Sequence, residues 1–140
     1  MKLPTEISLE FEEISNESEE FIRFLHHWSD DIELHFPNFS IYDITFATVY
    51  LLKVNTKPSG LFIYQDKGEQ LHIDLDYLIP EYRDMGIGNS FFEKKMDDFK
   101  KEGFEIIIAV SENPIYTKYL KELGFVRSNL HNTRFEYTIT

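Results

Sequence analysis

The chain has 140 residues, of which 42% are hydrophobic and 16% are aromatic. This length is enough to bury one core and short for two, so we expect a single domain over residues 1–140. The sequence contains no cysteine, which excludes disulfides, thiolate zinc sites and cysteine nucleophiles. A formal net charge of −11 disfavours nucleic acids and anionic membrane surfaces as partners, because both attract Lys and Arg.

The start of the chain and its hydropathy bear on its location. Met1 to Glu6 leads into an acidic stretch and lacks the apolar core of a secretory signal. No apolar run elsewhere is long enough to span a bilayer. We therefore expect a soluble, cytoplasmic protein.

The first quarter of the chain predicts a strand followed by a helix. Residues 8–14 alternate apolar and acidic side chains, which is the pattern of a half-buried strand. Asn16 and Glu19 have the spacing of a capping box, so a helix should begin there. Its apolar stripe consists of Phe21, Leu25 and Trp28. Residues 28–30 look like a helix break, and a shorter helical turn is expected over residues 30–35.

The middle of the chain predicts three strands. Residues 45–54 and 61–64 are rich in β-branched, aromatic and other apolar residues and are separated by a turn that contains Pro58 and Gly60. A third strand is expected over residues 71–79, where apolar and polar residues alternate. Its apolar face holds Leu71, Ile73, Leu75, Tyr77 and Ile79. Its opposite face holds His72, Asp74 and Asp76.

The remaining chain alternates helix and strand signals. Glycines end both predicted helices, and an Asn-Pro pair supplies the start of the second. The predicted elements are a helix from Gly86 to Gly103, a buried strand at residues 105–110, a helix from Asn113 to Gly124, and two last strands at residues 125–127 and 133–139.

The segment from residue 79 to residue 88 combines a strand end, an arginine and a glycine-rich helix start. The first N–H groups of a helix have no intrahelical acceptor, and the helix dipole adds positive charge, so phosphate oxygens bind there. Gly86 and Gly88 allow a ligand to approach the backbone closely. Two glycines at this spacing also occur in ordinary turns and helix caps, so the loop needs support from its context.

A second motif at a matching distance supplies that support. Residues 83–88 resemble the pyrophosphate loop of the GNAT acetyltransferase superfamily, and residues 113–125 resemble its later Asn-to-Leu-Gly-Phe segment. The resemblance covers nearly the whole chain and is strongest from Leu61 onward. It implies an α/β fold with a mixed, mostly antiparallel central sheet flanked by helices. It also implies that the strands at residues 71–79 and 105–110 splay apart.

The resemblance further implies that the chain binds acetyl-CoA as a co-substrate, without a metal. The pantetheine arm would lie between the splayed strands, and the Leu78 amide would polarise the thioester carbonyl. The residues expected to bind acetyl-CoA are Leu78, Ile79, Arg83, Met85, Gly86, Ile87, Gly88, Asn89, Ser90 and Asn113. Arg83 would either supply positive charge or hold the loop in shape. Asp84 departs from the family pattern, because a carboxylate repels a pyrophosphate, and we expect it to point to solvent.

Acyl transfer to an amine needs a base for the amine and a proton donor for the departing thiolate. We expect the base to be Asp74 or Asp76, whose pKa values would be raised by burial and by a neighbouring carboxylate. The alternative for each is a side chain on a solvated sheet face. The family commonly has Tyr where this sequence has Leu120. Tyr116 lies one helical turn earlier and is the substitute proton donor, with aromatic core packing as its alternative.

Four polar residues near residue 30 also need an interpretation. His26, His27, Asp31 and His35 suggest a metal site, but the last three share a face only if one helix runs through residues 28–30. We therefore expect no metal. The resemblance instead implies that residues 28–39 and 128–132 line the acceptor cleft.

These observations predict an N-acetyltransferase that moves an acetyl group from acetyl-CoA to a primary amine by direct attack in a ternary complex. The acidic charge favours a cationic acceptor, either a small metabolite or a lysine side chain. Two alternatives stay open: a non-catalytic module of the same fold, and an aromatic-rich interaction domain without a nucleotide site. The sequence does not distinguish a monomer from a homodimer.

Overall fold

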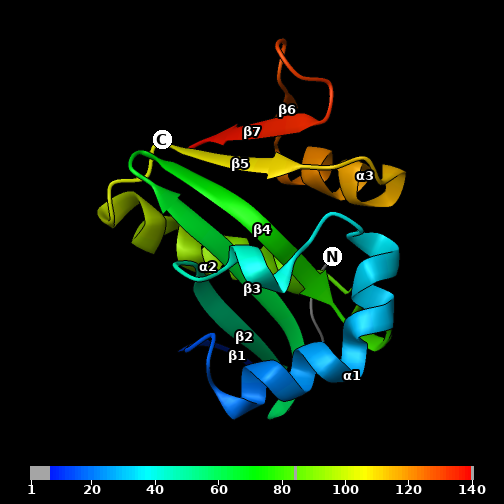
Figure 1. Ribbon diagram of the computed structural model, residues 1–140. Coiled ribbons are helices and arrows are strands. Elements are labelled where there is room, and N and C mark those ends of the chain that lie inside the picture. The colour runs from blue at the N-terminus through cyan, green and yellow to red at the C-terminus, as the bar shows by residue number, and fades with distance from the viewer. Residues whose placement is uncertain (1–6, 84, 140) are drawn as a thin grey trace.

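A computed structural model describes residues 7–83 and 85–139, and its centre is a seven-stranded sheet (Figure 1). The strands lie in the order β1-β2-β3-β4-β5-β7-β6. Their bounds are Leu9–Ile14 (β1), Thr48–Val54 (β2), Lys57–Lys67 (β3), Gln70–Leu78 (β4), Ile106–Val110 (β5), Val126–Arg127 (β6) and Arg134–Thr138 (β7). The helices are Glu19–His35 (α1), Ile87–Lys101 (α2) and Pro114–Leu123 (α3), with short 3-10 turns at Ile41–Asp43 and Pro80–Tyr82. Only the β4–β5 pair is parallel within this described sheet, so the predicted mixed, mostly antiparallel α/β fold is confirmed.

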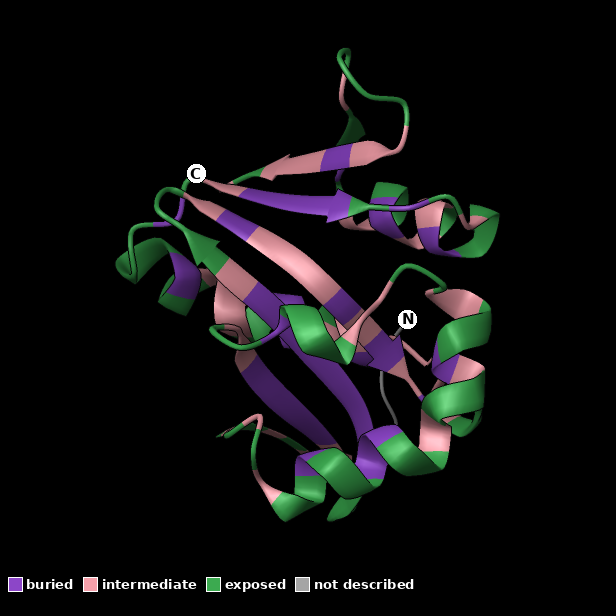
Figure 2. Cartoon of the chain, in the orientation of Figure 1, coloured by how far each residue is buried: buried purple, intermediate pink, exposed green. Residues whose placement is uncertain are grey.

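The helices cover both faces of the sheet. α1 packs on one face, in a hydrophobic cluster that includes Ile63 of β3. α2 and α3 pack on the other face, in a cluster that includes Phe62 of the same strand. Figure 2 shows that the central strands between these layers are largely buried, whereas the outer faces of the helices are exposed. Within residues 7–83 and 85–139, no helix is both long and apolar enough to cross a membrane.

The start of α1 differs from the predicted capping box. Ser18 is the N-cap, and its hydroxyl accepts a hydrogen bond from the Phe21 N–H. Asn16 instead donates from its side chain to the Ile44 carbonyl, 2.9 Å away. Asn16 thereby ties the turn after β1 to the segment before β2.

The predicted break in α1 at residues 28–30 is wrong. One helix runs over Glu19–His35. Phe21, Leu25 and Ile32 are buried at helical spacing along this whole length, so packing against the sheet carries the helix through the polar residues between them.

β3 is longer than the strand predicted at residues 61–64. It pairs with β2 from Lys57 onward, directly after a two-residue turn at Asn55 and Thr56. The φ angles of these two residues are 51° and 69°. Positive φ at both central residues is the geometry of the tight hairpin turn that matches the twist of the flanking strands.

A β-bulge divides β4 and changes which side chains share a face. The register of its pairing with β3 shifts between Ile73 and Leu75, so Asp74 is the extra residue. Leu71, before the bulge, packs in the cluster with α2 and α3. Leu75, after the bulge, packs in the cluster with α1. The predicted single apolar face over residues 71–79 is therefore wrong, because the extra residue reverses the alternation.

β4 and β5 are neighbours for three residue pairs and then part. Gln70, Leu71 and His72 pair with Ile106, Ile107 and Ile108, in that order. β4 continues to Leu78, so the two strands diverge toward their C-terminal ends (Figure 1). The predicted splay of the central strands is confirmed.

Candidate active site

The opening between β4 and β5 exposes the main chain of β4. In the antiparallel ladder with β3, the Ile79 N–H donates to the Ser59 carbonyl, 2.9 Å away. Successive N–H groups of a strand point to opposite edges, so the Leu78 N–H points toward the opening. The amide predicted to polarise a carbonyl therefore lies at the open edge, whereas the Ile79 N–H is used within the sheet.

Asp76 on β4 and Tyr116 on α3 meet across this opening. The Tyr116 hydroxyl donates to Oδ2 of Asp76 over 3.3 Å. Burial raises the pKa of Asp76 to about 7, and the hydrogen bond from Tyr116 opposes this effect only in part. Burial also raises the pKa of Tyr116, and the charge of Asp76 adds to that effect. The pair therefore combines a carboxyl group that titrates near neutrality with a phenol that keeps its proton.

Asp74 lies on the opposite face of the sheet, because the bulge separates it from Asp76. Its carboxylate accepts a hydrogen bond from the Gln65 side chain over 2.8 Å, and Gln65 also donates to the carbonyl of Asp43, just after α1. Burial raises the pKa of Asp74, while the Gln65 hydrogen bond lowers it. The prediction that His72, Asp74 and Asp76 share one polar face is therefore wrong. Burial, rather than repulsion between the two aspartates, raises both pKa values.

Arg83 fixes the loop after β4. Its guanidinium forms an ion pair with Asp31 of α1, and its Nε donates to the Leu78 carbonyl over 2.7 Å. The guanidinium carbon also lies 5.3 Å from the centre of the Tyr77 ring, and the Tyr77 hydroxyl donates to Asp31 over 2.5 Å. Of the two roles predicted for Arg83, these contacts favour the one in which it holds the loop in shape.

α2 begins directly after this loop. Gly86 is its N-cap, with a φ of 76°, a left-handed conformation that suits glycine. The Ser90 N–H donates to the Gly86 carbonyl, and the N–H groups of residues 87–89 precede this first helical hydrogen bond. Met85 packs against the cluster beneath α2. These residues form the predicted helix start, whose first N–H groups have no acceptor among the described residues, and Asp84 lies outside them.

The hydroxyl of Tyr119 on α3 lies against the first turn of α2. A Cβ atom added at Gly88 would fall 2.0 Å from the Tyr119 oxygen, so the close approach predicted for Gly88 is made by this phenol. The hydroxyl is buried and has no hydrogen-bond partner among the residues described. The Tyr119 ring stacks on Tyr116, with ring centres 6.0 Å apart. Tyr119 is absent from the predicted site, although its position three residues after Tyr116 on one helix signals a shared face.

Asn113 caps α3 and connects it with α1. Its Oδ1 accepts from the Ile115 N–H over 2.8 Å and from the Tyr116 N–H, while its Nδ2 donates to the His35 carbonyl over 3.4 Å. Phe36, the residue after α1, packs against Tyr116 with ring centres 5.1 Å apart. The end of α1 and the start of α3 therefore meet at the opening between β4 and β5. A contact of Asn113 with acetyl-CoA stays a prediction.

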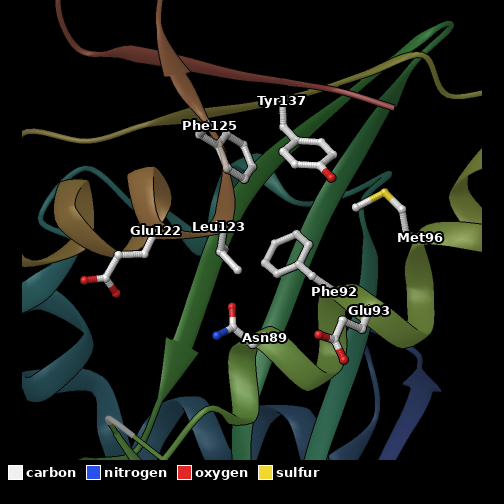
Figure 3. A pocket seen from close by; sticks show the side chains of 8 residues that line it. All are labelled: Asn89, Phe92, Glu93, Met96, Glu122, Leu123, Phe125 and Tyr137. Carbon is white, nitrogen blue, oxygen red and sulfur yellow. The ribbon is translucent and has the colours of Figure 1, made fainter. Parts of the chain in front are cut away.

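A cavity of about 430 Å³ lies between α2 and α3, beside the first turn of α2 (Figure 3). The residues that line it are Asn89, Phe92, Glu93, Met96, Glu122, Leu123, Phe125 and Tyr137. In Figure 3 the carboxylates of Glu93 and Glu122 lie at two sides of the cavity, with the Phe92 ring between them. Apolar walls with acidic sides suit a flat, uncharged ring better than a phosphate.

The continuous helix α1 does place His27, Asp31 and His35 along one face. Asp31 is engaged by Arg83 and Tyr77, and Nη1 of Arg83 lies 3.3 Å from Nε2 of His35. In the parts of the chain that the structure describes, no group of three or more His, Asp or Glu is arranged to hold a metal. Asp31 and His35 thus anchor the loop after β4.

The two segments predicted to line an acceptor cleft lie apart in Figure 1. Residues 28–39 end beside the opening, where Phe36 packs against Tyr116. Residues 128–132 form the turn between β6 and β7, which projects on the far side of β5 and β7 from α1 (Figure 1). Only the first segment lies close to Asp76.

Comparison with solved structures assigns the fold. The catalytic domain of the GCN5 histone acetyltransferase from Tetrahymena, in complex with coenzyme A, matches with a TM-score of 0.72 and 12% identity over 99% of this chain and 96% of that one. A GNAT family acetyltransferase from Elizabethkingia anophelis, with acetyl-CoA bound, matches with a TM-score of 0.69 and 15% identity over 93% and 97%. This chain has the GNAT fold.

A further GNAT-fold match is a Bacillus subtilis acetyltransferase in complex with CoA, with a TM-score of 0.67 and 14% identity over 95% of this chain and 100% of that one. No protein-family model matches the sequence, and no curated protein matches it either. The GNAT fold is therefore evident from the three-dimensional arrangement.

The polar groups along the opening fit one elongated ligand of the acyl-CoA type. The Leu78 N–H lies at the open strand edge, and the N–H groups of residues 87–89, which precede the first helical hydrogen bond, lie at the helix start. The buried Tyr119 hydroxyl, which no described residue accepts from, lies next to that helix start. A strand edge binds amides and carbonyls, and a helix start binds phosphates, so the order of these groups matches a thioester arm that ends in a diphosphate.

Proposed function

We propose that the chain is an N-acetyltransferase that moves an acetyl group from acetyl-CoA to a primary amine. The observation that carries this proposal is the splay of β4 and β5, which brings the Leu78 N–H and Asp76 to one opening. Neighbours of the same fold that were solved with CoA or acetyl-CoA support the choice of acyl donor.

The residues that would hold the acyl donor follow one another along the opening. The N–H groups of residues 86–89 would bind the diphosphate, with the Ser90 hydroxyl beside them. The Leu78 N–H would donate to the carbonyl oxygen as negative charge develops on it. The cavity beside Asn89 would take the adenine ring. Acetyl-CoA, when bound, supplies an acetyl group on a good leaving thiol.

Asp76 and Tyr116 would move the protons. As the acceptor nitrogen attacks the carbonyl carbon, a C–N bond forms, the C–S bond breaks, and Asp76 takes a proton from the nitrogen. Tyr116 would donate its proton to the thiolate and regain one from Asp76 through their hydrogen bond. A pKa of about 7 suits Asp76 to this role at neutral pH. We assign the base to Asp76 rather than to Asp74, because Asp74 faces the other side of the sheet.

The proposed acceptor is a cationic amine, either a small metabolite or a lysine side chain. A net charge of −11 enriches cations near the protein surface. Asp43 and Asp74 add negative charge on the face of the sheet that α1 covers. Amines that carry several positive charges should therefore be the better substrates at low ionic strength.

Thiol release from acetyl-CoA, measured with polyamines, amino sugars and lysine peptides, tests the proposal. We expect saturable turnover with at least one amine. Asp76→Asn should abolish turnover while calorimetry still detects binding of acetyl-CoA. Asp74→Asn is the matched variant on the other face of the same strand, and it should retain turnover. If Asp74→Asn lost turnover and Asp76→Asn kept it, Asp74 would be the base.

A second candidate function is a non-catalytic module that binds CoA. Leu120 favours it, because this residue is fully buried and occupies the position where the GNAT segment that residues 113–125 resemble commonly has a Tyr. Binding of acetyl-CoA without turnover on any amine of the panel would support this candidate. An interaction domain without a nucleotide site would show no binding of acetyl-CoA.

A further inference from the structure

The Tyr119 hydroxyl is a buried donor for which the proposed chemistry has no use. Burial of a hydroxyl without a hydrogen bond costs free energy, so such groups are rare and call for a physical explanation. Tyr116, its stacked neighbour, has an acceptor in Asp76, whereas Tyr119 has none among residues 7–83 and 85–139. Within the described residues the Tyr119 O–H therefore has no acceptor, and it is available to a ligand or a solvent molecule.

The position of this hydroxyl identifies the kind of acceptor that it can reach. Its oxygen lies 2.0 Å from the position that a Cβ atom on Gly88 would occupy, in the first turn of α2. The N–H groups of residues 87–89, which precede the first helical hydrogen bond, belong to the same turn. The groups described at this turn are donors, which suits an acceptor-rich anion, and a diphosphate presents several oxygens within reach of one helix start.

The protonation of Tyr119 is compatible with a donor role. Burial raises the pKa of this phenol far above its ordinary value, and the charge of Asp76 acts in the same direction. Tyr119 therefore keeps its proton at neutral pH. Its ring is held in place by the stacking on Tyr116, so the hydroxyl is presented with little loss of side-chain freedom.

We propose that Tyr119 is a ligand-binding residue whose hydroxyl donates a hydrogen bond to a diphosphate oxygen held by the first N–H groups of α2. This inference rests on the proposed function, since it needs an acyl-CoA ligand. It adds a side-chain donor on α3 to a set of main-chain donors on α2. The ligand thereby connects the two helices that pack on this face of the sheet.

Tyr119→Phe tests the inference, because it removes one oxygen and keeps the stacked ring. Calorimetry measures the affinity for CoA and for its two halves, 3′-phospho-ADP, which keeps the diphosphate, and pantetheine, which lacks it. We expect about tenfold weaker binding of CoA and of 3′-phospho-ADP, the loss typical of one hydrogen bond to a charged acceptor, and unchanged binding of pantetheine. The ligand-free variant should unfold at the same or a higher temperature, because an unpaired buried hydroxyl has been removed.

Tyr42→Phe is the matched control, because Tyr42 is 88% exposed and lies in the turn after α1. It should bind all three ligands as the wild type does. Unchanged or tighter binding of CoA by Tyr119→Phe would overturn the inference alone, since the phenol would then only fill space. A loss confined to pantetheine would overturn the diphosphate assignment. A wild-type protein that binds none of the three ligands would overturn the inference and the proposed function together.

Discussion

The hydroxyl of Tyr116 lies 3.3 Å from a carboxylate oxygen of Asp76, although 40 residues separate the two in the chain. Because burial raises the pKa of Asp76 to about 7, the proposed base is protonated and inactive in acid. The value of kcat/KM should rise about tenfold per pH unit below roughly pH 6 and level off above roughly pH 8. A pH–rate profile measures this, and a flat profile between about pH 5 and 8 would contradict the role of Asp76.

The raised pKa of Asp76 should make activity rise with pH but make the stability of the folded protein fall with pH. The folded protein binds the Asp76 proton with a pKa of about 7, against 3.8 for the ordinary group, so the free energy of unfolding falls as pH rises through this window. Asp76→Asn has no ionisable carboxyl group at this position, so its free energy of unfolding does not show this fall. Relative to the wild type, the variant should therefore gain stability between about pH 4 and pH 8 in denaturant titrations. A stability difference that does not change with pH would show that the carboxylate is not desolvated.

Tyr116→Phe should shift the pH dependence as well as lower the rate. The hydrogen bond from Tyr116 favours the ionised form of Asp76, so its loss raises the pKa of Asp76 and moves the acid limb to higher pH. The turnover number should also fall, by roughly a hundredfold for the loss of a proton donor. Turnover and pH profile measured with saturating acetyl-CoA check both effects. If Tyr116 only packs in the core, the acid limb will stay where it is in the wild type.

The ion pair between Asp31 and Arg83 should stabilise the loop before α2. Burial raises the pKa of Asp31, but hydrogen bonds from Tyr77 and Arg83 outweigh burial and leave it below 3.8. Asp31→Asn should cost about 1–2 kcal/mol of stability at neutral pH, a figure that allows for partial exposure. The cost should shrink as pH falls below about 4 and disappear only below the lowered pKa of Asp31, where the folded wild-type protein is protonated at this carboxylate too.

The exposed neighbour Asp30 supplies the matched control for this pair. Asp30→Asn should leave the unfolding midpoint at pH 7 unchanged, because this side chain is exposed. Equal unfolding midpoints for Asp30→Asn and Asp31→Asn at pH 7 would show that the ion pair between Asp31 and Arg83 does not contribute to stability. Thermal unfolding at pH 7 and at pH 3 distinguishes these results.

Glu93 and Glu122 should weaken binding of CoA if the nucleotide lies beside their cavity. Both carboxylates line it, and each repels the phosphates of the ligand. Changing both to Gln should tighten binding roughly threefold at low salt, with a smaller effect at high salt because of screening. The matched pair Glu10→Gln and Glu17→Gln removes two exposed charges elsewhere and should have no comparable effect. Equal affinities for the two double variants would place the nucleotide away from this cavity.

The order of helices and strands was predictable because their signals are local. The glycine-rich start of α2 and the Asn-Pro start of α3 lie where their turn and cap residues place them. The break in α1 was wrongly predicted because polar residues 28–30 lie between buried ones, and tertiary packing overrides the local preference there. The wrong capping residue has the same origin, since Asn16 finds a distant acceptor in the Ile44 carbonyl.

The arrangement of the candidate site was less predictable, because it depends on contacts between distant segments. The alternation over residues 71–77 is unbroken in sequence, so nothing in it marks the bulge at Asp74 that sends this residue to the face opposite Asp76. The partner of Arg83 is Asp31, 52 residues earlier, and no spacing rule connects them. The Asp76 and Tyr116 candidates do meet, because α3 packs on the face to which Asp76 turns after the bulge.

The amide of Leu78 and those at the start of α2 belong to the backbone, whose chemistry is common to every residue type except proline. A replacement of the attached side chain leaves such a donor in place as long as φ and ψ are kept. Only glycines with special geometry, such as Gly86 with its φ of 76°, restrict the choice. The same architecture around the parted strands is therefore compatible with the identity of only 12% to 15% found against the solved structures.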